Sequence, residues 1–439
     1  MINEPDSAFI NARFAWRAGA RLRATRRRLM RNTYGDQWSD LVKTSDGRVL
    51  TEYERAVGSG MSPMTNNLLR ALVKTVVGRF RYNVSQENHS SSADFQKFSV
   101  ENQLDELDSR AIEEFLISGC AIQKLTCERR SSGLGVWADN VSPDSFFVSP
   151  YLAPRGSDIR LIGMTSDMPL SEVKLRFGHG SKRRCREIER IYTDSVHSPV
   201  FGAPLSLGEG RSEPDFLRPS DPAMCRVIEV WSFDIDSSEP GDDPHWHCRF
   251  FTPSGKLLDE TRSLLPGGSH PFIVKMYPLT GGAVHPFIED LVDQQKHINK
   301  LITTIDHVLA NSAKGVLLLP TDCLPPGTDY VMAAGIWNKP GGVLPINPHA
   351  RQLPVEISSS GHSEGAAKLL ESELKMFQQI SGVTSALQGR AEGSNTSASL
   401  FESQVYQSAI ALLDVYETFN SFRSERNRAA LEFINVFSQ

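Results

Sequence analysis

The residues best suited to catalysis form a short glycine-flanked motif, Gly361-His362-Ser363-Glu364-Gly365. Its spacing matches the nucleophile elbow of serine hydrolases, in which a turn between a strand and a helix exposes a reactive serine. Ser363 would then be the nucleophile of a hydrolase. In that fold the catalytic histidine follows the serine, and the chain has no histidine after His362. A glycine- and serine-containing loop that leads into a helix is the simpler interpretation, and the hydrolase is kept as an alternative.

His245 and His247, with Cys248 beside them, suggest a metal site, because imidazole and thiolate groups are zinc ligands. Residues two apart share one face of a strand, so only the two histidines would converge. No CxxC or ExxH partner accompanies them, and a solvent-facing strand edge explains the pattern. The chain also lacks a GxxxxGK[ST] phosphate loop and a GxGxxG turn. We therefore expect no catalytic residue, no metal and no cofactor.

Residues 13–31 are strongly basic, and no acidic residue occurs anywhere from 7 to 35. Phe14, Leu22 and Leu29 lie at helical spacing among the arginines, which predicts a basic amphipathic helix. The arginines can contact phosphate or an acidic protein surface, or they can pair with carboxylates elsewhere in the fold or assembly. The candidate contact residues are Arg13, Arg17, Arg21, Arg26, Arg27 and Arg28.

Residues 284–314 contain one predicted long amphipathic helix, of about 27 residues and on the order of 40 Å. Its polar face carries Glu289, Asp293, Lys296 and Lys300, and Gln295 falls within the apolar seam. A helix with this pattern needs a neighbouring helix, as in a bundle, a ring or the core of an ordinary enzyme. The apolar residues that recur every three or four positions are Ile288, Leu291, Ile298, Ile302, Ile305 and Leu309.

Composition indicates a folded protein of two or three domains, since 40% of the 439 residues are hydrophobic. A net charge of -5 argues against binding nucleic acid over the whole surface, although a local basic patch remains compatible with it. Six cysteines without a CxxC pair and a start without signal-peptide character favour a reducing cytoplasm. No apolar run approaches the roughly 20 residues that span a bilayer, so we expect a soluble protein without membrane contact.

The order of predicted elements indicates an α+β fold with an inserted β-rich domain. A helix from Ser62 ends at Gly78 and is followed by a strand over 79–84. Further helices are expected at 94–118, 169–178, 364–380 and 397–435, and short strands at 120–165. A compact β-rich module is expected at 226–277, with a hairpin turn at Pro253-Ser254-Gly255.

Several segments, taken in order, resemble the portal proteins of tailed bacteriophages, particularly those of short-tailed phages. The likeness runs through most of the chain and begins with the arginine-rich helix. The segments that carry it are NTYGDQWSD at 32–40, NNLLRALVKTVVGRFRYN at 66–83, SPDSFFVSPYLAPRGSDIRLIGM at 142–164, HPFIEDLVDQQKHINKLIT at 285–303, WNKPGGVLPIN at 337–347 and ISGVTSALQGRAEGSNTSASL at 380–400.

The resemblance implies a non-enzymatic virion protein that forms a ring, usually dodecameric, at one capsid vertex. Double-stranded DNA would be packaged and ejected through the ring, with only non-specific contacts. The implied partners are further copies of the chain, major capsid and scaffolding proteins, terminase and tail adaptor proteins. Assembly would take place in the cytoplasm of the bacterial host.

The resemblance also implies a portal-like division of the chain, with a helical stem, an inserted β-rich clip, an α/β wing and a short helical crown. The expected parts are the wing at 1–165, the first stem helix at 166–184, the clip at 185–283, the second stem helix at 284–314, the channel loop and return through the wing at 315–400, and the crown at 401–439.

Within this scheme Lys296, Lys300 and Lys314 are the candidates for weak contact with DNA, and the six apolar residues of the long helix are the candidates for subunit packing. Two alternatives remain besides the hydrolase. One is a different head-tail connector, and the other is a structural protein that binds DNA through the basic arm at Arg26, Arg27 and Arg28.

Overall fold

The computed structural model combines helices and sheets, with about 50% helix and 20% strand, which agrees with the expected α+β class. Among the described residues, no helix is long and apolar enough to cross a membrane. The structure describes residues 4–86, 92–130, 133–153, 155–196, 214–234, 245–263, 269–312, 316–320, 322–325, 327–337, 343–357, 362–384, 387, 406–407 and 409–437.

The chain divides into two compact units, and each is assembled from separate stretches of sequence. The first unit consists of Met1–Arg31, Ala71–Glu289 and Asn395–Gln439. The second unit consists of Asn32–Arg70 and Asp290–Ser394. Each unit is described by itself below.

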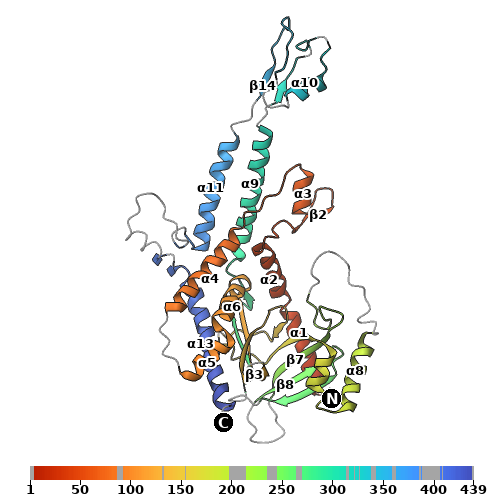
Figure 1. Ribbon diagram of the computed structural model, residues 1–439, viewed down its shortest axis with the longest axis vertical. Coiled ribbons are helices and arrows are strands. Elements are labelled where there is room, and N and C mark those ends of the chain that lie inside the picture. The colour runs from red at the N-terminus through yellow and green to blue at the C-terminus, as the bar shows by residue number, and fades with distance from the viewer. Residues whose placement is uncertain are drawn as a thin grey trace. The chain divides into compact units, whose positions relative to one another are not determined.

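A five-stranded antiparallel sheet forms one part of the first unit (Figure 1). The central strand of this sheet is buried at every residue from Cys225 to Ser232, as expected for a strand covered on both faces. In spatial order its strands are β5 (Phe146–Val148), β6 (Leu161–Met168), β7 (Cys225–Asp234), β8 (His245–Phe251) and β9 (Leu257–Arg262).

Helix α1 (Glu4–Ala18) packs on one face of this sheet, against β5, β6 and β7. The small residues Ala8, Ala12 and Ala15 face the sheet, and Trp16 joins an aromatic cluster with Phe147 and Phe216. On the other face, Trp231 and Trp246 join a second buried cluster with Phe272. These two clusters fix the sheet between apolar layers.

A three-stranded sheet forms the other part of the first unit. Its order is β10 (Phe272–Met276), β3 (Cys120–Arg130) and β4 (Gly133–Asn140), all antiparallel. Short strands β11 (Leu279–Thr280) and β12 (Ala283–Val284) form a hairpin after β10. The sheet packs against the helices α5 (Ala93–Asn102), α6 (Leu104–Ser118) and α13 (Leu413–Phe437).

Helices α7 (Leu170–Phe177) and α8 (Lys182–Val196) pack on each other beside β7 and β9. The predicted short helix at 169–178 is therefore confirmed. Val173, Phe177 and Ile188 form its core.

The expected β-rich insertion is not a separate module. Strands β7, β8 and β9 continue the sheet begun by β5 and β6, and β10 pairs with β3, so 185–283 contributes to both sheets of the first unit. The segment expected as a crown also belongs to this unit, because α13 packs against α5 and the three-stranded sheet. Strand patterning predicted these elements but could not predict their pairing across long loops.

The second unit contains two helices that run side by side, α9 (Val292–Ser312) and α11 (His362–Ser381) (Figure 1). Helix α9 follows a single 3-10 turn, η2 (Glu289–Leu291). Between α9 and α11 in sequence lie β13 (Val316–Leu318), α10 (Tyr330–Trp337) and β14 (Val355–Ile357), and β13 pairs with β14. The long helix is shorter than expected, because Pro286 and the β12 strand occupy its predicted start.

The earlier part of the second unit holds a small hairpin of β1 (Leu41–Lys43) and β2 (Val49–Thr51) and the helix α3 (Glu52–Gly58). Thr51 and Glu54 form a capping box, with each side chain accepting a hydrogen bond from the other residue's backbone N–H. The hairpin and α3 thus form a compact structure before the segment that leads to α4.

Two other helix predictions differ from the structure. The basic segment forms α1 and α2 (Ala20–Thr33), which meet at Gly19, instead of one helix over 13–31. Helix α4 (Leu68–Gln86) begins later than Ser62 and continues through Gly78 instead of turning into a strand. Glycine costs only about 1 kcal/mol in a helix, and burial of Val76 and Phe80 outweighs that cost.

Candidate functional site

Helix α9 carries a row of buried polar side chains that bind the segment leading into α4. Gln295, Asn299 and Thr303 occur every four residues and are almost completely buried. Thr303 Oγ1 accepts a hydrogen bond from the backbone N–H of Met64 (3.0 Å), and Asn299 Oδ1 accepts one from that of Asn66 (3.1 Å). The row therefore binds backbone N–H groups, which every residue except proline offers.

Gln295 completes the row by capping α4. Its Oε1 accepts from the backbone N–H groups of Leu68 (2.8 Å) and Leu69 (3.2 Å), which have no helical partners at the first turn. Its Nε2 donates to the carbonyl oxygen of Asn66 (2.7 Å) and to Asn299 Oδ1 (3.0 Å). Gln295, although distant in sequence, thus satisfies first-turn N–H groups of α4 as an N-cap residue would.

The spacing of this row fits the chain that it binds. Four residues of helix rise about 6.0 Å, and two residues of extended chain rise about 6.6 Å, so i, i+4 side chains match alternate backbone groups. The donors on residues 64, 66 and 68 meet Thr303, Asn299 and Gln295 in that order. The network fixes the register of the segment along α9.

Lys296 and Lys300, predicted to contact DNA, are bound to carboxylates of the hairpin and α3. Lys296 Nζ lies 2.5 Å from Asp40 Oδ2 and 3.2 Å from Glu52 Oε2, and Lys300 Nζ lies 3.1 Å from Glu52 Oε1. Lys296 is only 9% exposed, so a DNA contact does not fit this residue. Lys300 has a half-exposed side chain, and its contact with DNA stays a prediction. Lys314 lies outside the described residues.

The predicted subunit-packing residues divide into two groups. Ile288, Leu291 and Ile298 are almost fully buried within the single chain, and their role in packing between subunits stays a prediction. Ile302 and Ile305 are half-buried, and Leu309 is 52% exposed. This second group is the more exposed of the two.

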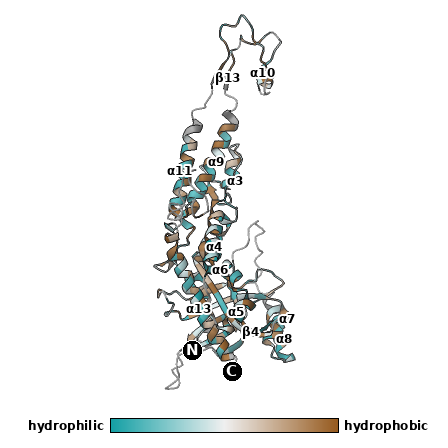
Figure 2. Ribbon diagram, turned by 60° about the vertical axis from the view of Figure 1, so that its left-hand side comes forward, coloured by the Kyte–Doolittle hydropathy of each residue, from teal (hydrophilic) through white to brown (hydrophobic). Residues whose placement is uncertain are grey.

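Helix α11 exposes an apolar stripe that sequence reasoning missed. Phe377 is buried, whereas Leu369, Met376 and Ile380 are each almost half exposed and recur at spacings of seven and four. Figure 2 shows hydrophobic residues along both α9 and α11. The signal was present in the sequence as a second apolar flank, but which flank faces α9 required the structure.

The apolar residues of β13, α10 and β14 and of the segment before β14 are also exposed. Their exposed fractions are 50–83% for Leu318, Val331, Met332, Val343, Leu353 and Val355. An exposed apolar group of this kind is typical of a surface that another protein covers.

The basic arm is partly committed to internal contacts. The Arg26 guanidinium contacts Glu114 with two hydrogen bonds (2.7 and 2.8 Å) and Asp144 with a third (2.6 Å). Burial alone would lower the pKa of Arg26, but the hydrogen bond and charge of Glu114 and the charge of Asp144 raise it. Arg26 therefore acts as a structural residue within the first unit, and not as part of a free DNA-binding arm.

The other candidate arginines lie nearer the surface. Arg27 is half-buried, with its Nε 3.4 Å from the carbonyl oxygen of Arg23. The exposed members are Arg13, Arg17, Arg21 and Arg28.

The structure describes the candidates for metal binding but not the side chain of the candidate for catalysis. Ser363 falls in the first turn of α11, and its side chain lies outside the described residues. His245, expected at a solvent-facing edge, is 6% exposed, and its Nδ1 lies 3.0 Å from Arg262 Nη2. No group of three or more histidine, cysteine, aspartate or glutamate residues among those described is arranged to hold a metal ion.

The sequence profile of the phage P22-like portal protein family matches residues 12–437. No curated protein matches the chain. Because the match covers nearly the whole chain, the protein belongs to the P22-like portal protein family of bacteriophages. Members of this family are structural, non-enzymatic proteins of the virion capsid.

Proposed function

We propose that the chain forms a ring of identical subunits, as a dodecamer, at one capsid vertex. Double-stranded DNA passes through this ring during packaging and ejection. Family membership supports the portal role. The observation that carries the ring is the stripe of Leu369, Met376 and Ile380 on α11, which is left exposed beside the α9 seam. In a closed ring each subunit contributes two different faces to its two neighbours, and this stripe supplies one of them.

We also infer a revised division of the chain. Helices α9 and α11 are the two stem helices, and the segment 316–357 between them is the clip, in place of the division at 166–184, 185–283 and 284–314. The support is the order helix, small module, helix, together with the pairing of α9 and α11. The two sheets with α5, α6 and α13 then belong to the wing.

The exposed apolar side chains of the proposed clip, such as Val331, Met332 and Val343, suit docking of terminase and tail adaptors. Major capsid and scaffolding proteins are the partners that we propose for the wing. Lys300 is the one described lysine of α9 that we retain as a weak contact for DNA backbone phosphate.

Mass photometry of the purified chain tests the ring. We expect a discrete large oligomer, and we expect Leu369→Ser with Met376→Ser and Ile380→Ser to shift it to monomers while the circular dichroism spectrum is retained. The control replaces Lys375, an exposed neighbour on α11 that pairs with Glu371, by serine and leaves the oligomer intact. Monomers only at micromolar concentration, even with the other capsid components present, would refute the proposal.

A further inference from the structure

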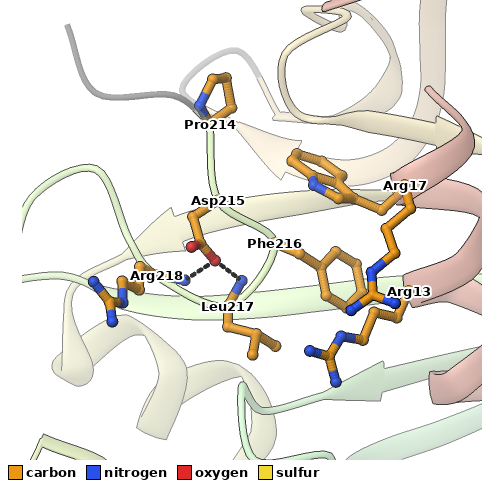
Figure 3. A pocket seen from close by; sticks show the side chains of 8 residues that line it. Arg13, Arg17, Pro214, Asp215, Phe216, Leu217 and Arg218 are labelled. Atoms are coloured by element: carbon orange, nitrogen blue, oxygen red, sulfur yellow. Dashed lines mark hydrogen bonds between the residues drawn. The ribbon is translucent and has the colours of Figure 1, made fainter. Parts of the chain in front are cut away.

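A pocket of about 330 Å³ lies in the first unit between α1 and the loop at 214–218 (Figure 3). Arg13, Trp16 and Arg17 line it from α1, and Phe216 and Leu217 line it from the loop. These two stretches are about 200 positions apart in sequence. The pocket is therefore a product of the fold that no local motif indicates.

Arg13 and Arg17 carry charges that no described residue of the chain pairs with. Arg13 and Arg17 are one helical turn apart, both are exposed, and Figure 3 shows both directed along the same side of Phe216 and Leu217. No hydrogen bond or ion pair engages either guanidinium within the described part of the chain. Each can therefore bind an anion without giving up an existing contact.

Asp215 is the one acidic residue among those that line the pocket, and it is turned to its own loop. Its Oδ1 accepts hydrogen bonds from the backbone N–H groups of Leu217 (2.7 Å) and Arg218 (3.2 Å), as Figure 3 shows. This is an Asx-type turn, which orders the loop. Asp215 therefore shapes the pocket wall and leaves the charge of Arg13 and Arg17 uncompensated.

Hydrogen bonds and aromatic packing hold the loop at 214–218, which forms one wall of the pocket, in place. Buried Arg226 donates to the carbonyl oxygen of Asp215 and pairs with Asp167, whose second oxygen accepts from the backbone N–H of Ser220 (2.9 Å). The rings of Phe216 and Trp16 lie 5.6 Å apart in the core cluster. A ligand thus meets a preformed site, which lowers the entropic cost of binding.

We propose that this pocket docks an acidic segment of another protein, in which a carboxylate lies next to an aliphatic or aromatic side chain. The carboxylate binds Arg13 and Arg17, and the apolar side chain packs against Phe216 and Leu217. The charge complementarity selects an anionic partner. The apolar wall selects protein over DNA, because a phosphate backbone has no apolar side chain to place there.

Fluorescence anisotropy with a short labelled peptide of repeated Glu-Glu-Leu tests the proposal on the full-length protein. We expect saturable binding that weakens when glutamine replaces the glutamates or serine replaces the leucines. Arg13→Gln with Arg17→Gln should weaken binding about tenfold or more, since each removes a charge-assisted hydrogen bond. Both residues are exposed, so the variant should keep the circular dichroism spectrum and oligomeric state of the wild type.

Arg21→Gln is the matched control, because Arg21 is an exposed arginine of the same basic segment that does not line the pocket. It should change the affinity by no more than about twofold, the change expected for a distant surface charge. The proposal is overturned if the peptide does not bind, if the double variant binds as tightly as the Arg21 variant, or if a short DNA duplex binds through Arg13 and Arg17 more tightly than the peptide. None of these outcomes bears on the ring.

Discussion

Different kinds of contact stabilise the interior of each of the two units. In the first unit, buried aromatic residues of α4 and α13 pack on each other, and the ring centroids of Phe80 and Phe419 lie 5.2 Å apart. In the second unit, α9 binds the 64–69 segment through hydrogen bonds to backbone, while apolar residues of α11 remain exposed. A unit that buries its apolar surface can be stable alone, whereas one that leaves it exposed gains stability from a partner.

The largest effect is expected from breaking a buried ion pair in the first unit. Lys124 of β3 lies 2.6 Å from Glu229 of β7, and both side chains are almost fully buried. Lys124→Met leaves the Glu229 carboxylate without its counter-ion, and we expect the free energy of unfolding to fall by about 3–5 kcal/mol. Urea denaturation monitored by circular dichroism measures this change.

The control for that variant is Lys97→Met, because Lys97 forms only an exposed pair with Glu101 at 4.0 Å. It should change the free energy of unfolding by less than about 1 kcal/mol. Equal losses for the two variants would contradict the view that the first unit depends on its interior.

Two neighbouring residues of α11 differ strongly in burial within the second unit. Phe377 is 6% exposed and Met376 is 48% exposed. Phe377→Ala should lower stability by about 3 kcal/mol because it leaves a cavity. Met376→Ala should change the stability of the monomer by no more than about 0.5 kcal/mol, measured by thermal unfolding at a concentration where the chain is monomeric. A large loss for Met376 under those conditions would mean that its own chain covers it.

The polar row predicts a smaller but specific effect. Gln295→Ala removes the cap from Leu68 and Leu69 and should cost about 1–3 kcal/mol. Gln295→Glu keeps the acceptor oxygen and should recover part of the loss, although it cannot donate to Asn66. Hydrogen exchange at the first turn of α4 provides the measurement, and unchanged protection in the alanine variant would argue against the cap.

Acid should affect the first unit through Glu229, with little effect near neutral pH. Burial alone would raise the pKa of this carboxyl, but the charge and hydrogen bond of Lys124 and the hydrogen bond from Trp231 hold it below 4.5. Its stabilising contribution is therefore complete above pH 4.5 and is lost as the pH falls from there through the lowered pKa. Denaturation midpoints from neutral pH downward should show this loss, and Glu229→Gln should remove that part of the pH dependence.

Sequence patterns predicted the elements better than their contacts. The hairpin turn at Pro253-Ser254-Gly255 and the helix after Pro169 are found as predicted, because local turn and capping preferences determine both. Periodicity places Gln295 in an apolar seam, because periodicity reports only spacing. The side-chain amide of this residue accepts a hydrogen bond from the backbone of Leu68, more than 200 positions away, and no local sequence pattern predicts that pairing.

The same limit applies to the candidate site. Charge alone grouped Arg26 with Arg13 and Arg17, but burial separates them: Arg26 pairs with Glu114, whereas the other two line an open pocket. Lys296 was expected to contact DNA for the same reason and is instead bound by Asp40 and Glu52. Predicting which charges are compensated requires the tertiary fold.

The backbone N–H groups of residues 64, 66 and 68 bond to three side chains of α9, and this pairing limits which mutations the segment from Met64 to Leu68 can accept. Adding or deleting one amino acid there would turn alternate N–H groups away and forfeit the bonds to Thr303, Asn299 and Gln295 together. The bond at Met64 uses the backbone N–H, so any residue other than proline can make it. The backbone contacts thus set the length of this connection, whereas its composition is constrained separately at Thr65 and Asn67, whose side-chain oxygens accept hydrogen bonds from Trp38 and Arg70.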